Sequence, residues 1–263
     1  MELTLPLANL EVVMLAGVRI AAFLVIAPPF AHRAIPGTVK AMLALGLGLL
    51  TAPRATAAAQ AAGVPVGTSI ASGTATFIGD LLLQVLVGLA LGFLVAMVFS
   101  AVQSAGALID LFGGFQIAAA YDLGSQFQGA QFSRLYQMTA MVLLFASDAY
   151  QVVIAGLVRS FDALPLGVPL NLSALGASVT TGLTQLFVAS LQIAGPLVVV
   201  LFLADVGLGL VSRVAPALNA FALGFPLKIL LTLTLGIGAY LALPQVVARL
   251  TETAVGSMSG VLG

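Results

Sequence analysis

The chain has 263 residues, of which 61% are hydrophobic and 7% charged, and nine basic and nine acidic side chains give a formal net charge of zero. An ordinary soluble domain carries about 25% charged residues. The composition therefore excludes a soluble globular enzyme, whose surface needs a polar cover. It also excludes a nucleic-acid-binding protein, which needs a basic face, and a disordered chain. The sequence predicts a protein surrounded mostly by lipid or by other apolar protein.

Two residue types that are common in catalytic and metal sites, cysteine and histidine, are nearly absent. The chain has no cysteine and one histidine, His32, which leaves no thiolate nucleophile, cysteine metal site or histidine cluster. No glycine cluster is followed by Lys-Ser or Lys-Thr, and no serine stands in a Gly-x-Ser-x-Gly motif. We therefore predict no enzymatic activity, no catalytic residue, no cofactor and no bound metal.

The first apolar stretch runs from Leu10 to Ala27 and carries Glu11 and Arg19. No basic residue precedes it, and Pro28-Pro29 ends it, so we interpret it as a retained first helix and not as a cleaved signal peptide. His32-Arg33 follows in a turn. The next apolar stretch, Pro36–Ala52, begins with a proline at a plausible first helical position.

The middle of the chain alternates connections with one clear membrane span. Pro53–Ser72 is rich in Ala, Thr, Gly, Ser and Pro and is predicted to be an exposed connection. Ile78–Gln103 is long enough to cross a bilayer, which takes about 20 apolar residues. Gly106–Gly129 follows as a central stretch that is not apolar enough to span, and we predict irregular backbone there, buried in protein or lining a cavity.

Three further apolar stretches complete the chain. Ser133–Val158 is interrupted by Asp148, Leu172–Leu203 is long enough for one tilted span or two short ones with a kink at Pro196, and Leu227–Val247 is a clear span. The segment between the first two, Leu164–Asn171, is predicted to be a loop. These stretches predict an all-α membrane protein with about six apolar helices. Charges inside a span are costly, so the interrupted helices are expected to pack on other protein.

Five aspartates raise the alternative of an ion-coupled small-solute transporter, because carboxylates inside spans mark ion paths. Most of them lie near expected helix ends or in the central stretch, where capping and pairing between helices are the commoner roles. The five residues are Asp80, Asp110, Asp122, Asp148 and Asp205.

The stretch Ala204–Lys228 (ADVGLGLVSRVAPALNAFALGFPLK) resembles the signature of the FliR family of flagellar and type III secretion export-gate membrane proteins. The resemblance extends in order along nearly the whole chain and includes Pro28-Pro29-Phe30 and Gly113-Gly114-Phe115. The matching signature residues, which we expect to mediate subunit packing, are Asp205, Arg213, Pro216, Asn219, Phe221, Gly224, Phe225, Pro226 and Lys228.

The resemblance implies a non-enzymatic gate in the flagellar basal body of a bacterial inner membrane. It implies that one copy assembles with several copies of FliP and FliQ into a helical pore for unfolded export substrates, with FlhB around the entrance. An injectisome gate of the same family is the alternative. Residues 1–170 would form a FliP-like part and residues 171–263 a FliQ-like hairpin. Helices carrying charges such as Arg19, Asp148, Asp205 and Arg213 would be buried against sister subunits.

The resemblance also places the family's plug in the central stretch, at Gly106–Asp122. Two glycines allow the backbone to bend there, and bulky apolar side chains can close a narrow passage by excluding water. A static loop between helices is the alternative. The predicted plug residues are Gly106, Asp110, Phe112, Gly113, Gly114, Phe115, Ile117 and Asp122.

Overall fold

The computed structural model describes residues 7–65, 67–116, 131–215 and 220–260. Within these ranges all regular structure is helical, which confirms the predicted all-α class. Five of the described helices are long and apolar enough to cross a membrane, or six if the bent pair α6 and α7 counts as one span. The prediction of about six apolar helices is thereby confirmed.

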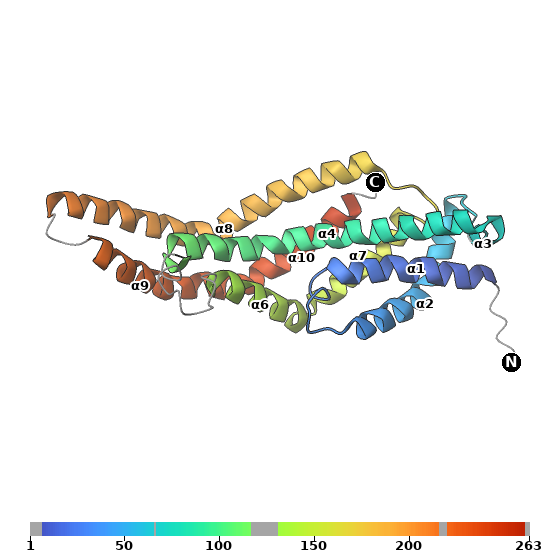
Figure 1. Ribbon diagram of the computed structural model, residues 1–263, viewed down its shortest axis with the longest axis horizontal. Helices are drawn as coiled ribbons and strands as arrows, with labels where there is room; N and C mark the ends of the chain where they lie inside the picture. Colours follow the sequence, from blue (N-terminus) through green and yellow to red (C-terminus); the bar gives the residue numbers. More distant parts are fainter. Residues whose placement is uncertain (1–6, 66, 117–130, 216–219, 261–263) are drawn as a thin grey trace. The chain divides into compact units, whose positions relative to one another are not determined.

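The chain divides into two compact units. Unit 1 comprises 1–98, 147–183 and 251–263, and unit 2 comprises 99–146 and 184–250. The described helices are α1 (Leu7–Ile26), α2 (Gly37–Ala61), α3 (Ser69–Ser72), α4 (Thr74–Phe112), α6 (Gln131–Ala146), α7 (Ala149–Ala163), α8 (Leu172–Val214), α9 (Ala220–Leu241) and α10 (Leu243–Gly260) (Figure 1).

Small residues bring the helices of unit 1 together. α1 and α2 lie side by side, and an ideal Cβ on Gly48 would come within 2.9 Å of the Gly17 Cα. On α4, a Cβ on Gly88 would lie 2.2 Å from the carbonyl oxygen of Arg19 and one on Gly92 would lie 3.0 Å from that of Phe23. Close backbone approach between apolar helices is what glycine permits in membrane proteins. The core of unit 1 is therefore built on the α1–α2 and α1–α4 crossings.

The second helix is longer than the sequence indicated. α2 continues through Pro53 to Ala61, so the predicted exposed connection at 53–72 is wrong over its first nine residues. Ala55 and Ala59 are fully buried, and α2 contacts α7. Alanine is the best helix former, and burial of this face offsets the hydrogen bond that Pro53 cannot make.

The predicted span Ser133–Val158 is two helices instead of one. α6 and α7 meet at an angle of 77°, and Asp148 between them has a φ of 55°. Aspartate is one of the few residues besides glycine that tolerate this left-handed conformation. The side-chain Oδ1 of Asp148 also accepts a hydrogen bond from Gln151 Nε2 at 3.2 Å. The charge that interrupts the apolar stretch thus marks a sharp bend.

The other helix boundaries agree with the sequence predictions in some places and differ from them in others. The loop at 164–171 precedes α8 as predicted, and α8 is one continuous helix that contains Pro196. α9 begins at Ala220, seven residues before the predicted span Leu227–Val247, and ends at Leu241. In the central stretch, 106–112 is the last part of α4, so the prediction of irregular backbone is wrong there. The helix continues because its last turns pack against α6.

Candidate functional site

Asp110 joins the end of α4 to the beginning of α6. Its carboxylate oxygens accept hydrogen bonds from the backbone N–H groups of Phe132 and Ser133, each at 2.9 Å. These residues lie in the first turn of α6, where backbone N–H groups have no partner within the helix. Asp110 is fully buried, and the positive end of the helix dipole favours its negative charge. It therefore acts as an N-cap supplied by another helix.

Gly106 lies one turn before Asp110 and makes room for this cap. An ideal Cβ on Gly106 would lie 2.6 Å from the Cα of Ser133 and 2.7 Å from the carbonyl oxygen of Phe132. Residues four apart share a helix face, so Gly106 and Asp110 together form a seat for the first turn of α6. The sequence pattern marked both residues but assigned them to a plug.

The Gly113-Gly114-Phe115 motif and the signature stretch Ala204–Lys228 contact each other in unit 2. Gly114 has a φ of 81°, and a Cβ there would lie 3.0 Å from the ring of Phe225 on α9. A Cβ on Gly113 would lie 2.9 Å from Oγ1 of Thr232, also on α9. Phe115 packs edge-on against Phe132 with ring centroids 5.2 Å apart. The first part of the predicted plug therefore lies against α6 and α9.

Of the three remaining predicted plug residues, the structure describes one. Phe112 is half-buried at the end of α4. Ile117 and Asp122 lie outside the described residues. The assignment of these residues to a plug stays a prediction. The predicted plug residues that the structure describes, from Gly106 to Phe115, lie where α4, α6 and α9 meet. We call this region the Asp110 junction.

The described residues of the signature stretch lie at the end of α8 and in the first part of α9. Lys228 Nζ pairs with Asp205 Oδ1 at 2.5 Å, which links the two helices. Gly224 is buried and lies near Leu208, with an ideal Cβ 3.4 Å from Cδ1 of that leucine. Arg213 is exposed in the last turn of α8, and Pro226 lies inside α9. Pro216 and Asn219 lie outside the described residues, as does the side chain of Phe221. A role of these residues in subunit packing stays a prediction.

Unit 1 contains a second polar centre, around Arg19. Arg19 is fully buried, and its Nε donates to Oε1 of Gln84 at 2.8 Å. Its Nη1 donates to the carbonyl oxygens of Ser160 at 3.3 Å and Leu164 at 2.9 Å, at the end of α7. The guanidinium also stacks over the ring of Phe161, 4.3 Å from the centroid, a favourable cation–π arrangement. Arg19 thus ties α1 to α4 and to the last carbonyls of α7.

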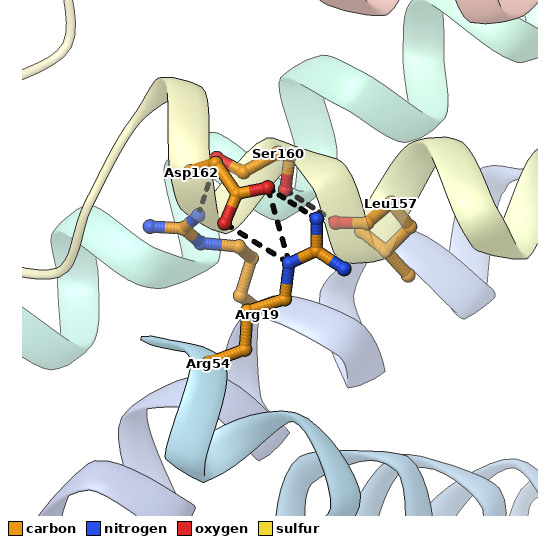
Figure 2. A network of polar contacts seen from close by, with 5 residues as sticks. All are labelled: Arg19, Arg54, Leu157, Ser160 and Asp162. Atoms are coloured by element: carbon orange, nitrogen blue, oxygen red, sulfur yellow. Dashed lines mark hydrogen bonds and ion pairs between the residues drawn. The ribbon is translucent and has the colours of Figure 1, made fainter. Parts of the chain in front are cut away.

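A second arginine reaches the same end of α7 from the surface. Arg54 of α2 forms a bidentate pair with Asp162, with an Nη2–Oδ2 distance of 2.5 Å, and both side chains are about half exposed. Figure 2 shows the guanidinium groups of Arg19 and Arg54 directed at the last turn of α7, beside Ser160 and Asp162.

The placement of Arg19 corrects one expectation. The resemblance implied that the helix carrying Arg19 buries its charge against sister subunits, whereas Arg19 is buried inside its own chain. Gln84 was missed, although a lone polar residue within a long apolar stretch is a visible signal. Glu11 was noted only as a charge. It is buried and accepts hydrogen bonds from the backbone N–H groups of Ser69 and Ile70, at 3.0 and 3.1 Å.

The described aspartates each have a partner of their own. Asp80 accepts a hydrogen bond from Oγ of Ser69, and Asp110, Asp148 and Asp205 have the partners given above. In the described ranges no three His, Asp or Glu side chains gather in a metal-binding arrangement. The predictions of no metal and no cofactor stay predictions.

The apolar helices and the buried Arg19 and Asp110 contacts define an all-α membrane protein. Comparison with protein families shows that the chain belongs to the family "Bacterial export proteins, family 1", whose model matches residues 10–254. The resemblance seen in the sequence is thereby confirmed.

Individual relatives cover much of the chain. It is 34% identical to the flagellar biosynthetic protein FliR of Escherichia coli strain K12, over 89% of this chain and 84% of that protein. It is 28% identical to FliR of Bacillus subtilis strain 168, over 82% of this chain and 81% of that protein. The Yop proteins translocation protein T of Yersinia pestis is 29% identical, over 55% of this chain and 56% of that protein.

Proposed function

We propose that this chain is a structural gate subunit of the flagellar type III protein export apparatus, without enzymatic activity, in the bacterial inner membrane. The observation that carries the proposal is the similarity to Escherichia coli FliR across 89% of the chain. The match to the Yersinia pestis translocation protein covers 55% of the chain, which favours a flagellar gate over an injectisome gate. No observation favours an ion-coupled solute transporter.

The exposed apolar surface supports assembly with other apolar subunits. α8 and α9 expose large apolar side chains along their length, and surfaces of this kind need lipid or protein cover. We propose FliP and FliQ as the subunits of the core complex, FlhB as a neighbour at the entrance, and unfolded export substrates as the cargo. Residues 1–170 are proposed as the FliP-like part and 171–263 as the FliQ-like hairpin. The exposed residues include Leu191, Val199, Phe202, Leu210, Leu230, Leu233 and Ile237.

Removal of this chain from its host should abolish secretion of flagellar filament and hook proteins, because the export pore would lack its gate subunit. Immunoblots of culture supernatants measure the loss, and the intact chain supplied on a plasmid is the control for restoration. Co-purification of tagged protein with two other small membrane proteins is expected. Normal flagellar secretion combined with loss of uptake of a small solute would contradict the proposal and support a transporter.

The contacts of the Asp110 junction bear on which of the predicted plug residues can move. Because Gly106 and Asp110 hold α6 against α4, they are suited to carry a plug and not to move as one. We propose that Gly106–Asp122 forms the plug of the resting pore, with Gly106 and Asp110 at its fixed base.

A deletion of residues 117–129 replaced by a short Gly-Ser linker should leave the complex assembled but leaky to small ions. The deletion spares Asp110 and the first turn of α6, so their packing is retained. Ion leakage across membranes that contain the purified complex measures the effect, and a complex with the intact chain is the control. A deleted complex that assembles and stays as tight as the intact one would show that closure comes from other subunits.

A further inference from the structure

The outer face of α2 is apolar over the first half of the helix and lies uncovered in unit 1. The opposite face of α2 packs against α1 and α7, whereas Met42 is 73% exposed and Leu50 is 77% exposed. An ideal Cβ on Gly46, on the same outer face, would meet nothing within 4 Å, so no described residue covers the helix there. The large apolar side chains of this face are Val39, Met42, Leu43, Leu45, Leu49 and Leu50.

The length of this apolar face matches one leaflet of a bilayer. Val39 and Leu50 are about 17 Å apart along the helix axis, at ~1.5 Å per residue. The hydrocarbon core of a bilayer is about 30 Å thick, which gives each leaflet about 15 Å. Beyond Leu50 the exposed positions of α2 include Arg54 and Gln60, and Arg54 is paired with Asp162. The outer face thus changes from apolar to polar after the depth of a single leaflet.

The other end of the apolar face carries positive charge without negative charge. Arg33 is exposed in the turn between α1 and α2, and Lys40 is half-buried in the first turn of α2 (Figure 1). Residues 12–79 contain no aspartate or glutamate. In the described ranges Arg54 and Lys228 form ion pairs, and neither Arg33 nor Lys40 does. Long basic side chains at the end of an apolar helix extend to the headgroup layer of a membrane.

We infer that the outer face of α2, with Arg33 and Lys40, is a binding site for an anionic phospholipid. The phosphate of the headgroup pairs with the two cations, and the acyl chains cover the face from Val39 to Leu50. A zwitterionic lipid fits the apolar part equally well but brings its own cation to Arg33 and Lys40, so it binds more weakly. The inference goes beyond the proposed gate role and does not depend on it, because it rests on residues of unit 1 alone.

The test uses the full chain in its purified complex, in phosphatidylcholine nanodiscs that contain a photoactivatable phosphatidylglycerol or a photoactivatable phosphatidylcholine. Mass spectrometry of peptides that cover residues 39–50 measures the labelling. Phosphatidylglycerol should label them roughly 20-fold more than phosphatidylcholine does, because each basic residue near an anionic headgroup contributes about a fivefold gain in affinity. Equal labelling by the two lipids would overturn the inference and show general contact with the bilayer.

Charge variants locate the selectivity. Arg33→Gln combined with Lys40→Gln should reduce labelling by phosphatidylglycerol to the level of phosphatidylcholine, whereas Arg33→Lys combined with Lys40→Arg should retain the preference. Arg54→Gln is the matched control. It removes the same charge from α2 but lies about 20 Å from Lys40 along the helix, beyond the screening length of about 8 Å at physiological salt. Labelling by phosphatidylglycerol should therefore be unchanged.

Two further outcomes would overturn the inference. The first is an equal loss of labelling in Arg54→Gln, which would show a response to net charge alone. The second is no labelling of 39–50 by either lipid in the complex with the intact chain, which would show that another protein subunit covers the face. The comparison of the two lipids on the intact chain decides the inference even if a charge variant fails to accumulate.

Discussion

Arg19→Ala should destabilise the chain by about 3 kcal/mol or more, because buried acceptors that lose their donor cost ~1–3 kcal/mol each and the truncation leaves a cavity. Oε1 of Gln84 and the carbonyl oxygen of Leu164 would lose the donor that they have here. The expected result is little or no folded protein in the membrane. Immunoblots of membrane fractions and thermal melting of the purified complex measure it.

Arg54→Ala is the matched control for Arg19. It removes a guanidinium that reaches the same end of α7, but from a half-exposed position. Exposed ion pairs contribute little, so this variant should accumulate nearly as well as the intact chain. Equal losses in the two variants would contradict the view that the buried hydrogen bonds, and not the charge near α7, stabilise this region.

The contacts of Arg19 also predict how substitutions at Gln84 change the stability of the chain. Nη2 of Arg19 and Nε2 of Gln84 are buried without a hydrogen-bond partner in the described ranges. Gln84→Glu would replace the unpaired donor by a second acceptor, suited to bidentate pairing with a guanidinium. We expect stability equal to or above that of the intact chain, whereas Gln84→Leu should lower it.

Gly88→Ala should cost about 3 kcal/mol or more and should also prevent accumulation. The added Cβ would lie 2.2 Å from the carbonyl oxygen of Arg19 and 2.8 Å from the Cβ of Ala22. Backbone atoms cannot move aside as a flexible side chain can, so α1 and α4 would have to separate, and overpacking of this kind costs ~1–3 kcal/mol or more. The melting temperature of the complex and the membrane level of the chain measure the effect.

Gly79→Ala is the matched control on the same helix. A Cβ on Gly79 would meet nothing within 4 Å, and alanine is favoured over glycine inside a helix by ~1 kcal/mol. Gly79→Ala is therefore expected to be neutral or slightly stabilising. If Gly88→Ala melted at the same temperature as Gly79→Ala, the close α1–α4 crossing would not be a feature of the folded protein.

The sequence was sufficient for the class of protein and for its family. The share of charged residues, 7%, and the six apolar stretches follow from amino-acid composition alone. The signature from Asp205 to Lys228 is a local sequence pattern. Such properties depend little on which parts of the chain meet, and for this reason the all-α membrane fold and the export family could be predicted without coordinates.

Only the tertiary structure decided where helices end and which polar groups meet. α2 passes Pro53 because its alanine face is buried, and α4 continues through Gly106 because α6 packs there. Asp110 and its partners are 22 and 23 residues apart, and Arg19 and Leu164 are 145 residues apart. A local pattern shows that a buried charge needs a partner, but the partner is chosen by the packing of helices far apart in the sequence.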